Sequence, residues 1–479
     1  MRNRLLVSAL AAVFAAGCAV APVYERPALE LPGAWKDAAT GVAAAEPRWW
    51  TLYNDPVLDR LVDEALAHNQ DLAVAAARVD EARASLRITH AEQLPSVDAS
   101  VSRDRTRSSE RSSTPLPPSV PLERNSYRGQ LNVAYELDLW GRLASLSEAA
   151  RAELLATRAA QETVRLALTA QVVQSYFALL ALDAQIEATR RSLELRERNL
   201  ALQRLRRDAG VIGDFDLHQL EAEVATARAQ LPAFERSRTT EEAALAVLAG
   251  RSPRAVLEDA VARGKDSGEF AAPVVPAGLP SDLLLRRPDV VEAEQRLIAL
   301  NARIGAARAA LFPRISLTGF FGTESAALGD LLTGPSRVWQ LAFGLAQPIF
   351  QGGRLYGEIE AVQARERQAI AQYQKTLQEA FREVRQALAA QTRSREILSA
   401  EGERVGALSE ALRLARLRYE NGLTSQLEFL DAERNLLQAE VNRIEALRAN
   451  RAAVADVTRA LGGGWAGMES TAARRTTQR

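Results

Sequence analysis

Residues 127–139 read YRGQLNVAYELDL, and residues 339–349 read WQLAFGLAQPI. In both segments apolar side chains occupy most alternate positions, and polar or small residues lie between them. Side chains of a β-strand point alternately to its two faces, so the pattern predicts two strands that each have one apolar face. Shorter alternations at residues 97–101 and 315–321 predict two further strands.

An apolar face and a polar face over about ten residues are typical of a strand in an outer-membrane β-barrel. A half-buried sheet of a water-soluble protein has the same alternation. In lipid every backbone polar group must be paired, and known single-chain barrels have at least about eight strands. Four strands cannot close a barrel, so strands that span a membrane here must share one barrel among several chains. The polar segments 103–125 and 323–336 are expected to be the loops between strands.

The predicted strands belong to a unit that occurs twice. In the first copy, a long helical pattern begins at Arg142 and ends at a turn at Gly210, and a return helix ends near Gly250. The same signals recur 212 residues later, at Arg354, Gly422 and Gly462. Upstream residues match at an offset of 218, namely Asp71 with Asp289 and Pro95 with Pro313. We therefore predict two copies of a helix, two strands, a long helix and a return helix, which is an internal two-fold repeat.

The long helical segments have apolar residues in alternating steps of four and three. These residues are Leu166, Ala170, Val173, Phe177 and Leu180 in the first copy. In the second copy they form two runs, Leu377, Phe381, Val384 and Leu388, and then Val405, Leu408, Leu412, Ala415 and Tyr419. Such a repeat predicts that a stripe of each helix is buried against neighbouring helices. A helix from residue 142 to 208 would be about 100 Å long, too long for the inside of a globular domain.

The N-terminus has the features of a bacterial lipoprotein signal. Arginines precede an apolar run at residues 5–16, and small residues lead to Cys18, the only cysteine. This order is typical of a secretory signal, and its end resembles a lipobox, in which the cysteine becomes the acylated mature N-terminus. We expect a signal peptide at residues 1–17 and lipidation at Cys18. No later stretch of about 20 apolar residues follows, so no transmembrane helix is expected.

Composition gives no indication of catalysis. The formal net charge is zero, so nothing indicates nucleic-acid binding. A single cysteine permits no disulfide framework. The three histidines, His68, His90 and His218, have no second ligand at metal spacing, and no pair of nucleophile and base is recognisable. We expect no enzyme activity, no metal site and no cofactor.

Residues 284–290, which read LLRRPDV, together with FPRI at 312–315, resemble the TolC-like outer-membrane efflux proteins. The similarity is greater to the lipoprotein branch that works with resistance-nodulation-division (RND) pumps. Supporting stretches are YELDLWGR at 135–142, QPIFQGGR at 347–354 and LDAER at 430–434. The resemblance runs from Pro22 to Trp465.

This resemblance implies an α+β membrane protein that forms a homotrimer. Three chains with four strands each would make one outer-membrane β-barrel, continuous with a long periplasmic α-helical barrel. The expected function is passive export of small molecules such as drugs, with a periplasmic adaptor protein and an inner-membrane RND pump as partners. The chain would divide into a lipid-anchored extension (18–55), a first repeat (56–262), a linker (263–278), a second repeat (279–464) and a flexible tail (465–479).

The resemblance also implies a gate where the helical hairpins turn. By similarity of the segment 427–431, Asp431 would contribute to a ring of three carboxylates and Leu427 to a hydrophobic ring one helical turn away. Both kinds of ring form constrictions in channels. Phe215, the repeat equivalent of Leu427, is expected to assist. From the residues alone, the favoured interpretation is that Leu427 packs in the helix seam and that Asp431 is a solvated surface charge.

Other functions are expected near the turns at Gly210 and Gly422. Arg416, Tyr419 and Asn421 are candidates for contacts between neighbouring hairpins. Segments 204–216 and 416–428 are candidates for docking the adaptor.

Two alternatives remain open from the sequence. A soluble periplasmic adaptor lipoprotein also has helical hairpins, but it carries one hairpin and no lipid-facing strands. A type I secretion duct would export proteins instead of small molecules. The sequence does not identify the exported substrate.

Overall fold

The computed structural model describes residues 20–28, 30, 32–33, 48–111, 117, 119–258, 260–264, 273, 275 and 286–463. The predicted signal peptide, Cys18, the C-terminal tail and most of the 263–278 linker lie outside these residues. The chain forms two compact units. One contains the described parts of 1–28, 79–157 and 293–373, and the other those of 29–78, 158–292 and 374–479.

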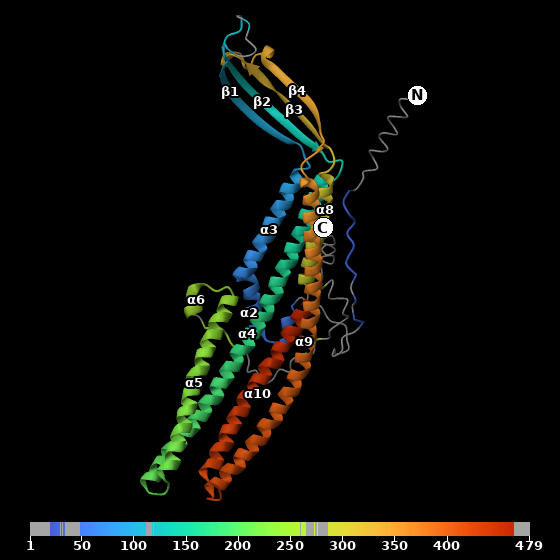
Figure 1. Ribbon diagram of the computed structural model, residues 1–479. Coiled ribbons are helices and arrows are strands. Elements are labelled where there is room, and N and C mark those ends of the chain that lie inside the picture. Colours follow the sequence, from blue (N-terminus) through green and yellow to red (C-terminus); the bar gives the residue numbers. More distant parts are fainter. Residues whose placement is uncertain are drawn as a thin grey trace. The chain divides into compact units, whose positions relative to one another are not determined.

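The main helices occur in pairs of equal length. Helices α4 (Arg142–Asp208) and α9 (Arg354–Glu420) have 67 residues each, and α5 (Asp214–Leu248) and α10 (Gln426–Ala460) have 35 each. Helices α3 (Gln70–Ala91) and α8 (Pro288–Ala309) have 22 residues each. These bounds follow the offsets of 212 and 218 residues found in the sequence. Helices α4 and α5 form one antiparallel hairpin and α9 and α10 a second (Figure 1).

The predicted four strands are confirmed and form one antiparallel sheet in the order β1-β2-β3-β4. Their bounds are β1 Ser96–Arg107, β2 Glu123–Leu137, β3 Arg314–Ser325 and β4 Arg337–Ala346. Two short 3-10 turns, η4 (Leu328–Asp330) and η5 (Gly334–Ser336), lie between β3 and β4. The sheet is open, with β1 and β4 at its edges (Figure 1).

The strand bounds correct the expected loops. Residues 103–107 are not loop but the end of β1, where they pair with residues 123–127 of β2. Cross-strand ion pairs support this extension, since Glu123 binds Arg105 at 2.6 Å and Arg107 at 3.4 Å. The loops are therefore shorter than 103–125 and 323–336, because β3 likewise continues to Ser325.

The alternating pattern also continues further than the strands do. Strand β2 ends at Leu137, before Leu139, and β4 ends at Ala346, before Ile349. Strand β4 is followed by Gln347 and then by Pro348, which has no backbone N–H to donate to a neighbouring strand.

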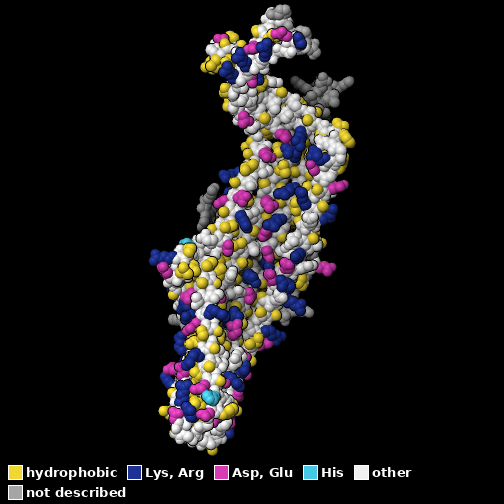
Figure 2. Space-filling view, turned by 60° about the vertical axis from the view of Figure 1, so that its left-hand side comes forward, with side chains coloured by type: hydrophobic (Ala, Val, Ile, Leu, Met, Phe, Trp, Pro, Cys, Tyr) yellow, Lys and Arg dark blue, Asp and Glu magenta, His cyan; other side chains and the backbone are white. Residues whose placement is uncertain are grey.

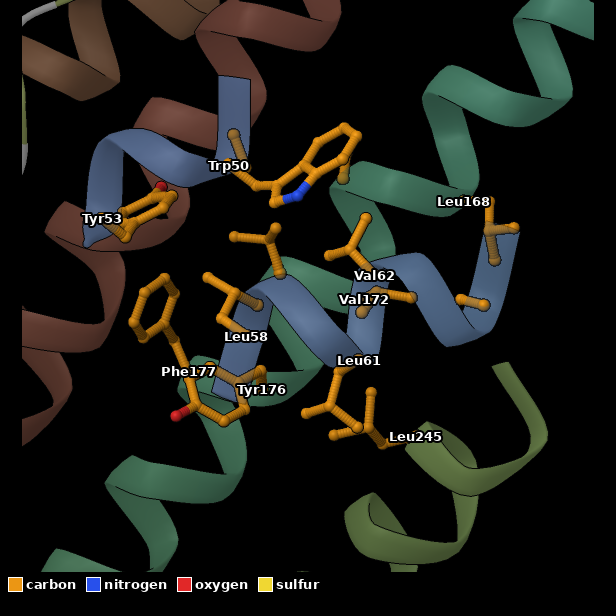
Figure 3. Close-up of a cluster of buried hydrophobic side chains, with 14 of the residues drawn as sticks. Trp50, Tyr53, Leu58, Leu61, Val62, Leu168, Val172, Tyr176, Phe177 and Leu245 are labelled. Atoms are coloured by element: carbon orange, nitrogen blue, oxygen red, sulfur yellow. The ribbon is translucent and has the colours of Figure 1, made fainter. Parts of the chain in front are cut away.

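A buried core lies around the short helices before α3. It joins η1 (Trp49–Tyr53) and α2 (Pro56–His68) to α4 and α5 (Figure 3). Asp55 caps α2 by accepting a hydrogen bond from Val57 N at 2.9 Å. Its other oxygen accepts from the buried Tyr176 hydroxyl at 2.5 Å, and that hydroxyl accepts from Gly264 N at 2.9 Å. These bonds tie the start of α2 to the middle of α4. The short helix α6 (Pro253–Glu258) follows α5.

Helix α4 contains an 18-residue stretch that could cross a membrane by its length and composition. No such stretch was expected from the sequence. Half of this stretch is buried inside the chain. Val172, Val173 and Tyr176 are among the α4 residues packed in the core, so packing against α2 accounts for their apolar character. On the face shown in Figure 2, side chains of both charges are interspersed over the helices.

Candidate functional site

The two hairpin turns have the same backbone geometry. Gly210 and Gly422 have φ values of 72° and 70°, in the left-handed region that glycine adopts without steric strain. In each turn the glycine N–H and the next N–H bind carbonyls of the last helical turn, which is the Schellman arrangement. The bonds are Gly210 N to Arg207 O (2.9 Å), Val211 N to Arg206 O (2.9 Å), Gly422 N to Tyr419 O (3.0 Å) and Leu423 N to Arg418 O (2.8 Å).

The three predicted gate residues are exposed within the single chain. Leu427 is 57% and Phe215 79% exposed, and the Asp431 side chain is 50% exposed. Leu427 and Asp431 are four residues apart on α10, so they lie on one helix face. Asp431 pairs with Arg434 and accepts a hydrogen bond from Asn435 at 3.0 Å. Leu427 is therefore not packed in a seam of this chain, and its face of α10 is open to solvent.

Of the three predicted tip residues, Tyr419 makes a contact between the hairpins. Its hydroxyl accepts a hydrogen bond from Gln203 Nε2 of α4 at 2.9 Å, and its ring stacks on Phe429 of α10 with centroids 5.6 Å apart. Arg416 pairs with Glu420 at 3.4 Å within α9, and Asn421, the residue after α9, donates to Leu417 O of α9 at 2.7 Å.

A small apolar cluster, which we call the hairpin-end cluster, joins the two hairpins. Leu430 of α10 is buried in it beside residues of the first hairpin. The buried members are Leu200, Leu217, Leu220, Val224 and Leu430, with Leu193 and Phe429 packed against them. Leu430 therefore lies on the side of α10 that faces the first hairpin.

Next to this cluster is a buried cation that the sequence analysis missed. The Arg196 side chain is 4% exposed, and its Nη1 donates to Glu223 Oε2 of α5 at 2.9 Å. Its Nε lies 3.7 Å from Glu433 Oε1 of α10. Burial raises the pKa of Glu433 above its ordinary value, although the positive charge of Arg196 acts in the opposite direction. Arg196 thus links α4, α5 and α10.

The sequence contains a signal for these contacts. Leu193, Arg196, Leu200 and Gln203 follow steps of three, four and three, so two polar residues occupy positions of an apolar helix seam. Gln203 is fully buried and Arg196 nearly so. Within the described residues, no group of three or more His, Cys, Asp or Glu side chains could hold a metal ion.

Comparison with known proteins identifies the family. The sequence profile of the family described as "Outer membrane efflux protein" matches residues 61–251 and 279–463. The chain is 39% identical over 464 residues to the outer membrane protein OprJ of Pseudomonas aeruginosa, covering 96% of each chain. It is 36% identical over 473 residues to the toluene efflux pump outer membrane protein TtgC of Pseudomonas putida, covering 97% of this chain and 96% of the relative.

The fold is similar to a solved channel of the same kind. The crystal structure of the Campylobacter jejuni CmeC outer membrane channel superposes with a TM-score of 0.91 at 26% identity, covering 96% of this chain and 98% of that one. The alternative of a soluble adaptor is therefore wrong. The chain belongs to the outer membrane efflux proteins and is the outer-membrane channel component of an efflux system.

Proposed function

We propose that the chain is a passive, gated export duct that works as a homotrimer. One observation carries this proposal, namely an open four-stranded sheet with one exposed apolar face. Nine large apolar side chains on that face are 42–86% exposed. They are Val97, Val101, Leu131, Val133, Phe321, Trp339, Leu341, Phe343 and Leu345. An apolar surface of this kind is suited to lipid, and in lipid the free edges of β1 and β4 must be paired.

Three chains would close one barrel of twelve strands. Each β1 edge would pair with the β4 edge of the next copy, since a sheet in lipid leaves no edge unpaired. The paired hairpins of the three chains would form the periplasmic α-helical barrel. We propose the division into an N-terminal extension, two repeats at 56–262 and 279–464, and the linker between them. The two segments matched by the family profile support it.

The gate is proposed at the hairpin ends. Leu427 and Asp431 share the exposed face of α10, whereas Leu430 faces the first hairpin. In a closed ring of hairpins, this face is available to line the lumen. A carboxylate ring attracts cations and a leucine ring resists wetting. Phe215 would assist from the first hairpin, and Arg416, Tyr419 and Asn421 would hold neighbouring hairpins together.

The partners would be a periplasmic adaptor and an inner-membrane RND pump, which supplies the energy of transport. The chain itself would not be an enzyme and would need no cofactor. Lipidation at Cys18 would anchor it to the outer membrane. We propose small toxic organic compounds as the exported class, in keeping with the word toluene in the name of one relative.

The test is the assembly and conductance of the purified protein. Detergent-extracted protein should have three times the mass of one chain by native mass spectrometry and should form pores in planar bilayers. A water-soluble monomer without pore activity would overturn the proposal. Cys18→Ala should keep the trimer mass in detergent but lose covalent acyl chains in intact-protein mass spectrometry.

A further inference from the structure

The register of the sheet sorts its side chains onto two faces. The pairs Val97–Val133, Tyr127–Ser325 and Ile315–Leu345 are in register, so the odd-numbered residues of all four strands share one face. This face carries the exposed apolar side chains described above. From Leu137 to Tyr127 the apolar part of β2 extends about 33 Å along the strand, or about 25 Å in height at a tilt of about 40°. That height matches the lipid-facing band of outer-membrane barrels.

At the Tyr127 end of this band, the same face carries arginines. Arg103 pairs in register with Tyr127, and Arg105 and Arg107 continue β1 away from the band. Arg337 begins β4, two residues beyond Trp339. We call these four residues the arginine rim. Arg103 lies over the Tyr127 ring at 5.5 Å, and the side chains of Arg105 and Arg107 are 66% and 68% exposed.

Acidic residues of the strands do not balance the rim. Glu123 is the only acidic strand residue on the odd-numbered face, and it holds Arg105 and Arg107. The other acidic strand residues lie on the opposite face and are Asp98, Asp104, Glu136 and Glu324. The rim therefore combines four guanidinium groups with one carboxylate, next to a tyrosine and a tryptophan.

We propose that the arginine rim binds the phosphate groups of the glycolipid headgroups that form the outer leaflet. Guanidinium groups suit phosphate oxygens because several N–H donors lie in one plane. Tyrosine and tryptophan at the end of an apolar band mark the level of the headgroups. Successive arginines on β1 are two residues, about 7 Å, apart. This spread row fits a surface of headgroups, not one enclosed phosphate. The inference rests on the proposed membrane-spanning sheet.

The test uses the purified, trimeric, full-length protein. Binding of fluorescent lipid A with both phosphates is compared with binding of the same lipid after removal of the phosphates. We expect the phosphorylated lipid to bind at least about tenfold more tightly, with a preference that falls as salt rises. The fourfold variant Arg103→Gln, Arg105→Gln, Arg107→Gln, Arg337→Gln should lose this preference.

The matched control is Arg124→Gln with Arg128→Gln, at the same end of the sheet but on the opposite face. It should keep the preference. If the fourfold variant does not assemble, the pair Arg105→Gln and Arg107→Gln should reduce the preference severalfold. No preference in the wild type, or an equal loss in the control, would overturn the inference. Inorganic phosphate should compete only at concentrations far above that of lipid A; binding of inorganic phosphate as tight as that of lipid A would also overturn the inference, since a free-anion site would be indicated.

Conductance of the same preparation separates the two hypotheses. If the trimer conducts but shows no preference for the phosphorylated lipid, phosphate binding by the arginine rim is rejected and the proposed export duct is retained. A monomer without pore activity rejects the export duct itself.

Discussion

The core around Leu58 and the hairpin-end cluster around Leu430 both include residues of α4, α5 and α10, but they differ in composition. The core buries five aromatic rings, and its hydroxyl groups on Tyr53 and Tyr176 are hydrogen-bonded. The hairpin-end cluster has five buried aliphatic residues and lies near a buried arginine. Buried polar atoms without a hydrogen-bond partner occur in both regions, namely Trp50 Nε1 in the core and Arg196 Nε and Gln203 Oε1 near the hairpin-end cluster.

This difference leads us to expect different roles for the two regions. Large aromatic side chains contribute much of the burial energy of a core, and the buried members of the hairpin-end cluster include none. Regions that move in function are drawn from the less stable parts of a protein. We therefore expect the core to hold the hairpins at their base and the hairpin ends to open first. Four predictions test this contrast.

The largest effect is expected from Leu58→Ala in the core. Leu58 is fully buried, so its truncation should lower the free energy of unfolding by about 2–5 kcal/mol through lost burial and a cavity. Thermal unfolding in detergent measures it. The control Leu52→Ala, at a side chain that is 42% exposed, should change stability by less than about 1 kcal/mol. Equal losses in the two variants would contradict the importance of this core.

The next effect is expected from Arg196→Met at the hairpin ends. Removing the cation leaves Glu223 and Glu433 close together without their partner, at a cost of about 3 kcal/mol. The loss should be local. Hydrogen exchange should rise in residues 193–203 and 427–435, with little change around Leu58. The control Arg198→Met, at a side chain that is 69% exposed, should leave exchange unchanged. A uniform loss across the chain would show that the ends do not open independently.

A smaller effect is expected from Glu433→Gln. Because the folded protein raises the pKa of this carboxyl, it binds the proton more tightly than the unfolded chain does. Its contribution to stability is therefore full below the ordinary value of 4.5 and is lost as the pH rises through the raised pKa. Arg196 and Arg416 oppose the shift and Glu223 adds to it.

In the wild type, the protection of the hairpin ends from hydrogen exchange should fall as the pH rises through this range. The protection is corrected for the intrinsic exchange rates at each pH. In Glu433→Gln it should fall less, whereas Glu445→Gln, at an exposed side chain, should behave as wild type. If protection in Glu433→Gln fell with pH as much as in the wild type, Glu433 would not be the cause of the pH dependence at the hairpin ends.

The smallest effect on stability, but an effect on conductance, is expected from Asp431→Ala. Its ion pair with Arg434 is exposed and contributes at most about 1 kcal/mol. Loss of the proposed carboxylate ring should raise passive conductance and sensitivity of a channel-deficient strain to large antibiotics. Glu445→Ala is a matched control, since Glu445 is also 50% exposed and pairs with an arginine three residues later on α10. Unchanged leakage in an assembled trimer would contradict the gate.

The sequence alone determined the elements and their order. Alternation located the four strands, and the glycines at 210 and 422 marked the helix ends, because both signals depend on the local geometry of the backbone. The strand ends were less predictable. Residues 103–107 look like loop, but a partner strand supplies backbone hydrogen bonds and Glu123 pairs with their arginines. Leu139 and Ile349 continue the alternating pattern, but they lie beyond the ends of β2 and β4.

Only the tertiary structure decided which side chains meet. The bond between Gln203 and Tyr419 joins residues 216 positions apart, and Arg196 meets Glu433 across two hairpins. Such contacts depend on how each helix is rotated about its axis and on which face packs against its neighbour. A charged residue in a helix is solvated in most settings, so its burial becomes visible only when the neighbouring helix is in place. Likewise, the shared face of the arginine rim follows from strand register, which pairs residues far apart in the chain.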